Sequence, residues 1–133
     1  MIRRTALAFS LLLITFPCQA AKLSCNLEES LIGPTYIELD TSTKVARILY
    51  PGLAGILDGH ISRISKAGNG TDSYNLTFND LPAPYNEQTW EFVLHRNSGD
   101  WYLFGSGYET IDGTRHLSSN RGQYSANCIS IEA

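Results

Sequence analysis

The sequence lacks a sustained helical pattern after residue 20. Apolar residues do not recur at helical spacing between capping residues, so a helical bundle is excluded and at most one short turn is expected, around residues 53–57. Apolar and polar residues instead alternate in short stretches, which are separated by Gly, Pro, Asn and Asp. This alternation predicts an all-β domain.

Positive charge is also scarce. The chain has 10 Lys and Arg against 13 Asp and Glu, and its formal net charge is -3. Removal of residues 1–20, which include Arg3 and Arg4, would leave 8 basic residues and a net charge of -5. Nucleic acid is not an expected partner, because phosphate binding needs a basic stripe. A cationic protein would be attracted.

The common catalytic and phosphate-binding motifs are missing. There is no phosphate loop, no dinucleotide fingerprint and no calcium loop. Ser106 lies between Gly105 and Gly107, but the spacing of a nucleophile elbow is absent. The two glycines are better explained as space for neighbouring aromatic rings. We therefore expect no catalytic residue and no cofactor.

Metal-binding spacing is missing as well. The three histidines, His60, His95 and His116, fall on separate predicted elements, so no metal site is expected. One enzymatic alternative stays open, a small hydrolase that uses a histidine or a carboxylate pair such as Glu109 and Asp112.

The first feature that is present is an export signal. Arg3 and Arg4 precede an uncharged run from Thr5 to Phe16, and small residues stand at the -3 and -1 positions if cleavage follows Ala20. The apolar run is too short to span a bilayer. The alternatives are an uncleaved membrane anchor and a lipoprotein acylated at Cys18. We predict a signal peptide at 1–20, a single β domain at 21–133, secretion to the bacterial periplasm, and no membrane attachment after cleavage.

Cleavage would leave two of the three cysteines. Cys25 lies near the start of the mature chain and Cys128 near its end. In an oxidising compartment these two residues are expected to form a disulfide that joins the terminal strands.

The densest apolar run after the signal predicts a central hairpin over 89–107. With a four-residue turn at Asn97–Asp100, Arg96 faces Trp101 and Leu94 faces Leu103 across the strands. One face then carries the core residues Trp90, Phe92, Leu94, Trp101 and Leu103.

A second hairpin is expected with a turn at Thr41–Lys44, which pairs Glu38 with Arg47. Further strands are expected at 21–29, 60–66, 73–79, 114–119 and 122–130, with a bulge or a single helical turn within 60–66. A long surface loop is expected at 80–88 and a crossover at 107–113. Seven or eight short strands in chain order predict a small antiparallel meander barrel, with a two-sheet sandwich as the alternative.

The other face of the central hairpin is unusually apolar. It carries Val93, His95, Tyr102 and Phe104, with Arg96 and Trp101 near the tip and a cation–π contact expected between these two. In a sandwich this face would be covered by the second sheet. In a barrel it would be a protein contact surface.

The segment Ser98-Gly99-Asp100-Trp101-Tyr102 and the final Tyr124–Cys128 strand resemble the periplasmic inhibitors of C-type lysozyme. Those proteins are small secreted β-barrels whose Ser-Gly-x-x-Tyr loop enters the lysozyme cleft. The resemblance implies that Ser98, Gly99 and Tyr102 contact the enzyme. This chain differs in having Trp101 where the family has a basic residue.

These observations predict a non-enzymatic β-barrel that binds an unidentified protein or a small apolar ligand. The alternative is an inhibitor of a cell-wall hydrolase. The candidate binding residues are Val93, His95, Arg96, Ser98, Gly99, Trp101, Tyr102 and Phe104. A filled barrel interior would restrict binding to the surface, and a hollow interior would admit a ligand.

Overall fold

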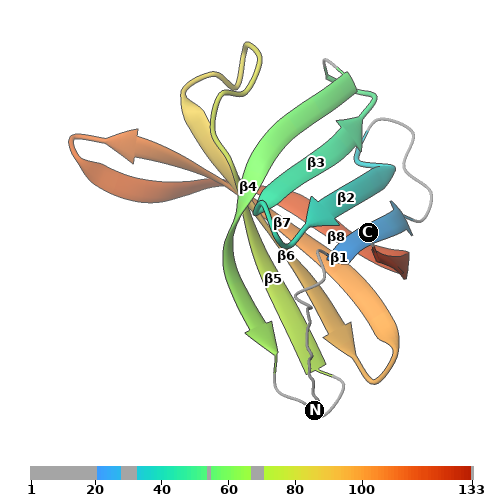
Figure 1. The fold of residues 1–133 in the computed structure, drawn as a ribbon. Coiled ribbons are helices and arrows are strands. Elements are labelled where there is room, and N and C mark those ends of the chain that lie inside the picture. Colours follow the sequence, from blue (N-terminus) through green and yellow to red (C-terminus); the bar gives the residue numbers. More distant parts are fainter. Residues whose placement is uncertain (1–20, 28–32, 54, 67–70, 133) are drawn as a thin grey trace, which may run out of the picture.

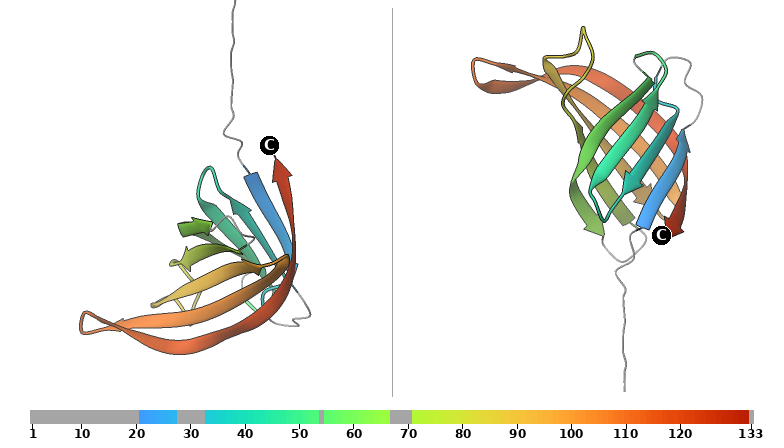
Figure 2. Two further views of the ribbon diagram at one scale, coloured as in Figure 1. Left: turned by 90° about the horizontal axis from the view of Figure 1, so that it is seen from below. Right: turned by 45° about the horizontal axis from the view of Figure 1, so that its top comes forward.

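The computed structural model describes residues 21–27, 33–53, 55–66 and 71–132. Each strand pairs antiparallel with the next one in the chain, and the last pairs with the first, so the sheet closes into a barrel (Figures 1 and 2). The strands are β1 Ala21–Leu27, β2 Tyr36–Asp40, β3 Val45–Tyr50, β4 Gly55–Lys66, β5 Thr71–Phe78, β6 Gln88–Asn97, β7 Asp100–Ile111 and β8 Thr114–Glu132. The prediction of an all-β meander barrel is confirmed, and the sandwich alternative is wrong.

The barrel has two ends that differ in their connections. At one end lie the start of β1, the end of β8 and the short β2–β3 and β6–β7 turns. At the other end lie the β3–β4 turn, the long β5–β6 connection and the β7–β8 turn. We call these the terminal end and the loop end.

Inward-facing side chains fill the middle of the barrel. Alternation along each strand places one face inside, and β5 follows it from Tyr74 to Phe78 as expected. The largest fully buried side chains include Trp90, Phe78, Phe92, Ile37, Leu39, Ile48, Leu76, Leu94 and Leu103. Phe78 and Phe92 meet edge to face with their ring centroids 5.7 Å apart. Because the centre is filled, the ends and the outer surface of the barrel are the places where a ligand or a partner could bind.

The predicted register of the central hairpin is confirmed. Arg96 pairs with Trp101 and Leu94 with Leu103. The turn is shorter than expected, because Asn97 pairs with Asp100 and only Ser98 and Gly99 lie between the strands. Their φ angles of 53° and 100° match the left-handed backbone of a two-residue hairpin turn.

The second hairpin also has the predicted register, with Glu38 opposite Arg47. The bulge expected in 60–66 is present, as a register shift between Ile61 and Arg63. The short helical turn expected around 53–57 is wrong, because only Leu53 belongs to a turn and β4 already begins at Gly55. Leu57 pairs with Ile48 and is buried. The extended conformation thus gives this apolar segment both backbone pairing with β3 and burial of Leu57 in the core.

The C-terminal part differs from the prediction. Residues 107–111 do not cross over but continue β7, and the two strands expected at 114–119 and 122–130 are one strand, β8. Asp112 and Gly113, with φ angles of 53° and 76°, form the turn between them. The part of this pair next to the turn, residues 108–117, projects beyond the barrel at the loop end (Figures 1 and 2). We call it the ribbon.

The predicted disulfide is present. Cys25 and Cys128 are directly paired residues of β1 and β8, and their Cα atoms are 4.0 Å apart. The bond therefore joins the two strands that close the barrel. Among the described residues, no helix has the length and apolarity needed to cross a membrane.

Candidate functional site

The predicted binding residues fall into three places. Val93, His95, Tyr102 and Phe104 lie on the outer face of β6 and β7, and the described part of the chain forms no second sheet over them. Phe104 is 39% exposed, and the rings of Tyr102 and Phe104 lie 6.5 Å apart. This outer face is therefore open to a partner.

Ser98 and Gly99 form an exposed tip at the terminal end. Beside the tip is a hollow of about 200 Å³, lined by Asp100, Trp101, Tyr102, Ser125, Ala126 and Asn127. The tip and Tyr102 are thus close together in the structure as well as in the sequence.

Arg96 and Trp101 lie on the inner face, at the terminal end of the barrel. The Arg96 guanidinium lies 5.6 Å from the centroid of the Trp101 ring, which confirms the expected cation–π contact. A hollow of about 290 Å³ adjoins them, and Asp72 places a carboxylate oxygen 3.9 Å from Arg96 Nη1. Arg96 thus already has an anionic neighbour within the protein.

The carboxylates considered for hydrolysis lie on the ribbon. Glu109 accepts a hydrogen bond of 3.3 Å from Gln88 and pairs across the strands with His116, while Asp112 is in the exposed turn. The other two histidines, His60 and His95, are on β4 and β6. In the part of the chain that the structure describes, no group of three or more His, Cys, Asp or Glu could hold a metal ion.

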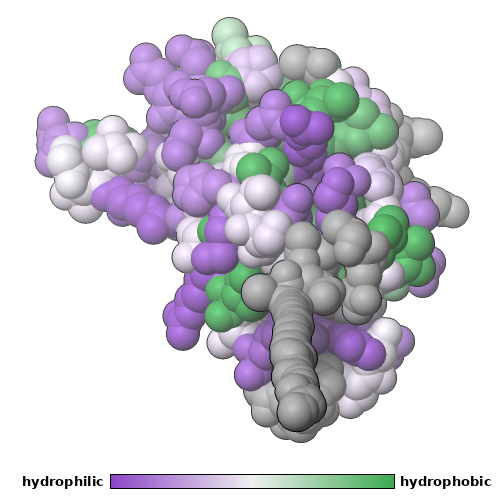
Figure 3. Space-filling model, viewed as in Figure 1, coloured by the Kyte–Doolittle hydropathy of each residue, from purple (hydrophilic) through white to green (hydrophobic). Residues whose placement is uncertain are grey.

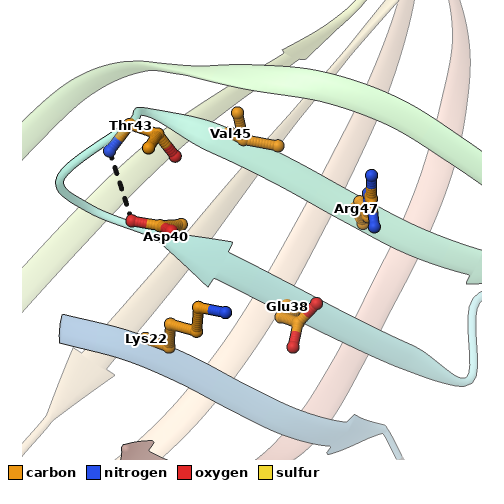
Figure 4. Close-up of a pocket in the computed structure, with 6 residues that line it drawn as sticks. All are labelled: Lys22, Glu38, Asp40, Thr43, Val45 and Arg47. Atoms are coloured by element: carbon orange, nitrogen blue, oxygen red, sulfur yellow. Dashed lines mark hydrogen bonds between the residues drawn. The ribbon is translucent and has the colours of Figure 1, made fainter. Parts of the chain in front are cut away.

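A charged depression of about 200 Å³ lies on the outside of β1–β3 (Figure 4). Two of its four charged groups, Asp40 and Arg47, have local contacts. Asp40 accepts hydrogen bonds from Ser42 and Thr43, and these hold its pKa below the ordinary value of 3.8. Arg47 binds Asp58 at 2.8 Å. This depression is explained by turn formation and a surface ion pair.

The surrounding surface in Figure 3 mixes hydrophilic and hydrophobic residues. Hydrophobic residues gather over the end of β3 and the beginning of β4. Leu49 and Ile56 are paired there and are 39% and 60% exposed. Two such neighbours form a small patch of a size that is ordinary for a protein surface.

The loop end holds a further open hollow, which we call the mouth pocket. Its volume is about 370 Å³. It is lined by Gly33, Tyr50, Gly52, Leu53, Tyr85, Trp90, Asn120, Arg121, Gly122 and Tyr124. Four of these residues are aromatic, and Arg121 is the only charged one.

The aromatic residues of the mouth pocket come from separate segments. Trp90 on β6 is fully buried, and its ring centroid is 5.5 Å from that of Tyr50 on β3 and 5.0 Å from that of Tyr85 in the β5–β6 connection. The indole Nε1 donates to Gln88 at 2.9 Å. Burial raises the pKa of Tyr50 above its ordinary value of 10.0. Tyr50 is therefore a neutral hydroxyl at physiological pH, able to donate or accept a hydrogen bond.

Arg121 reaches this pocket because β8 contains a bulge. Gly105 pairs with Gly122 and Ser106 pairs with Asn120, so Arg121 is the extra residue. Bulges commonly redirect a side chain next to a functional site. The Arg121 guanidinium lies 4.6 Å from the centroid of the Trp90 ring and 5.4 Å from that of Tyr85.

Three neighbours hold the bulge in place. The Gly122 N–H donates to the Asn120 side chain at 2.8 Å, and the Tyr124 hydroxyl donates to the Arg121 carbonyl at 3.0 Å. Gly122 has φ of 100°, and a Cβ there would lie 2.6 Å from the Tyr124 hydroxyl. The sequence 120–124 thus builds a fixed backbone that aims the arginine inward.

Arg121 differs from Arg96 in its surroundings. Both have a buried Nε without a hydrogen-bond acceptor. Arg96 has Asp72 nearby, whereas the ion pairs found among the described residues do not include Arg121. A buried N–H without an acceptor within the protein is a donor that a ligand oxygen can use.

The sequence reasoning did not identify Tyr50, Tyr85, Arg121 or Tyr124 as site residues. The available signal was Asn120-Arg121-Gly122 between two alternating stretches, which we interpreted as a break between strands. An Asn-x-Gly interruption is equally typical of a bulge in one continuous strand.

Comparison with known proteins adds no relative. No family model, no curated protein and no solved structure matches the chain.

Proposed function

We propose that this protein is an exported, non-enzymatic binding module that takes a small ligand in the mouth pocket. The observation that carries the proposal is a cavity of about 370 Å³ walled by four aromatic residues, with a single cation whose Nε lacks an acceptor. Small-molecule sites are typically concave, mainly apolar, and supplied with a few fixed polar groups.

The filled barrel centre supports a site at the end of the barrel. Trp90, Phe92 and Leu94 are fully buried along one strand, so a ligand bound at the barrel axis would have to displace core side chains. The mouth pocket needs no such rearrangement. Trp90, which lines the pocket, serves as an optical and NMR reporter of binding.

Export is supported by two features. Residues 1–20 have the composition of a signal peptide, and the Cys25–Cys128 bond is typical of proteins that fold in an oxidising compartment. Expression of the full chain in a bacterial host tests this. We expect a periplasmic product whose N-terminal sequence begins at Ala21, and a product that retains Met1 would contradict it.

Ligand binding is tested on residues 21–133 by an NMR screen with one- and two-ring aromatic compounds, both neutral and charged. The Trp101→Phe background leaves Trp90 as the only indole reporter. We expect saturable shifts of the Trp90 indole N–H and of the Asn120–Tyr124 amides. Shifts confined to the terminal end, or no saturable shift at all, would overturn the proposal.

A second candidate function is inhibition of a cell-wall hydrolase. It is favoured by the exposed Ser98-Gly99 turn, the adjacent hollow that includes Tyr102, and an acidic domain that would attract a cationic lysozyme. Titration of C-type lysozyme activity tests it, with Ser98→Ala and Tyr102→Ala expected to weaken inhibition. The control is Asp112→Ala, in the other two-residue turn at the loop end. Unchanged lysozyme activity at micromolar protein would exclude this function.

A further inference from the structure

We propose that the ligand of the mouth pocket is a ring compound that carries a single carboxylate. This inference rests on the proposed function and assigns the ligand class of the same site. The carboxylate would bind the Arg121 guanidinium, and the ring would lie against the tyrosines of the pocket wall.

The charge of the pocket favours an anion. Arg121 is the only charged residue among those that line it, although the domain as a whole is acidic. The guanidinium lies over the Trp90 and Tyr85 rings and interacts with the Tyr50 hydroxyl through a side-chain hydrogen bond, while its Nε lacks an acceptor. A carboxylate entering the pocket would supply that acceptor, in the fork geometry that arginine binds best.

The fixed backbone around Arg121 favours a specific ligand over a merely structural role. A cation needed only to cover Trp90 would not require Gly122 at φ of 100°, an Asn120 side chain bound to the Gly122 amide, and a Tyr124 hydroxyl bound to the Arg121 carbonyl. Together these contacts hold the arginine in position before a ligand arrives. Pre-organisation of this kind lowers the entropic cost of binding.

The walls favour a ring. Tyr50, Tyr85 and Tyr124 each present an aromatic surface with a hydroxyl at its edge, and the pocket volume of about 370 Å³ is at the small end of the range for small-molecule sites. Planar compounds stack well on such surfaces. A single cation in an acidic domain favours one negative charge over two, because a second charge would have no partner.

The test uses three naphthalene probes of the same shape, namely 2-naphthoate, 2-naphthamide and 2-naphthyl phosphate. Each is titrated into residues 21–133 of the Trp101→Phe protein, and the shifts of the Trp90 indole N–H and the Arg121 Nε–H are followed by NMR. We expect 2-naphthoate to bind about tenfold or more tightly than the neutral amide, and more tightly than the phosphate.

Variants locate the anion. Arg121→Gln should remove the preference for naphthoate over naphthamide, while Arg96→Gln, at the opposite end of the barrel, should retain it. Tyr124→Phe removes only the hydroxyl that holds the Arg121 carbonyl, and it should reduce naphthoate affinity more than naphthamide affinity. This variant keeps the test decisive if Arg121→Gln does not fold.

The outcomes separate the ligand class from the proposed function. Equal affinity for naphthoate and naphthamide, tighter binding of the phosphate, or equal loss in the Arg96→Gln protein would overturn the carboxylate assignment and leave the pocket as a binding site. If no probe and no compound of the screen shifts Trp90, both proposals fail.

Discussion

Gly105 illustrates how a single missing side chain shapes the interior. A Cβ at this position would overlap the Phe92 ring and would lie 2.7 Å from the Arg121 Cβ. The Phe92 ring thus crosses the neighbouring strand where the glycine leaves space, as expected from the sequence. The same space accommodates the Cβ of Arg121.

Gly105→Ala should therefore destabilise the protein by about 1–3 kcal/mol, because the added methyl group overpacks a filled core. Guanidinium chloride unfolding followed by tryptophan fluorescence measures the change. Ser106→Ala, at the next and partly exposed position, is the control and should alter stability by less than about 0.5 kcal/mol. Equal stability of the Gly105→Ala and wild-type proteins would contradict the packing described above.

Asp40 is another position where one side chain organises its surroundings. Its Oδ1 accepts hydrogen bonds from the Ser42 hydroxyl at 2.8 Å and from the Ser42 and Thr43 amides. The hydroxyl contact is the largest cause of the lowered pKa of Asp40, followed by the bond from the Thr43 amide. The β2–β3 turn thus depends in part on an ionised carboxylate.

Ser42→Ala should raise the pKa of Asp40 toward 3.8, as measured by a carbon-13 NMR titration of the carboxyl group. Because the folded-state pKa is depressed, the stability contributed by Asp40 is present above pH 3.8 and is lost as pH falls through the folded pKa. The stability difference between wild type and Ser42→Ala should accordingly shrink as the pH is lowered below 3.8. A difference independent of pH would argue against this role.

At the scale of whole elements, one part of the β7–β8 pair belongs to the barrel wall and the other part forms the ribbon. Near the disulfide, β8 pairs with both β7 and β1, whereas its first residues pair with β7 alone. After the register shifts at Gly105 and Gly107, β7 stays paired with β6 as far as Glu109, and beyond Glu109 the ribbon consists of β7 and β8 alone. Arg115 joins the ribbon to the barrel by an ion pair of 2.6 Å with Glu91, and its guanidinium lies 3.8 Å from the centroid of the Tyr108 ring.

The ribbon should open locally without unfolding of the barrel, because a two-stranded sheet with exposed faces is only marginally stable. We expect the amides of residues 110–115 to exchange with solvent about 100-fold faster or more than those of Leu94 and Leu103, which are fully buried. Hydrogen exchange followed by NMR measures this. Equal protection across β7 would mean that the ribbon and barrel open as one unit.

At the scale of the whole molecule, closure depends on β1 and β8. These strands come from opposite ends of the chain, and the Cys25–Cys128 bond joins them across a sequence separation of 103 residues. Closing a loop of that size lowers the conformational entropy of the unfolded chain, which stabilises the folded state by up to about 4.7 kcal/mol. The covalent bond therefore compensates for the low probability that two distant segments meet.

Reduction of the disulfide should lower the free energy of unfolding by about 3–5 kcal/mol. Guanidinium chloride unfolding with and without a phosphine reductant gives the difference. The Cys25→Ala/Cys128→Ala protein serves as the control, since its stability should be low and insensitive to reductant. Wild-type stability that does not change on reduction would show that strand pairing alone keeps the barrel closed.

Much of this architecture could be predicted from the sequence, because its determinants are local. Alternation along 74–78 decides which side chains of β5 face inward, and the turn residues at 41–44 and 97–100 decide the register of two hairpins. The disulfide followed from the removal of Cys18 with the signal peptide, which leaves one possible pair. These features need only neighbouring residues or simple counting.

The mouth pocket was decided by the tertiary structure alone. Tyr50, Tyr85, Trp90 and Arg121 belong to four separate segments. They meet because closure and strand stagger bring the loop ends of β3 and β6 beside the middle of β8. The bulge at Arg121 adds one residue to β8, and one extra residue reverses the face of the sheet on which the following side chains lie. Simple alternation along the sequence therefore does not predict where Arg121 points. Local pattern thus determined the inside and outside of each strand, and the closed barrel determined which of those side chains share a site.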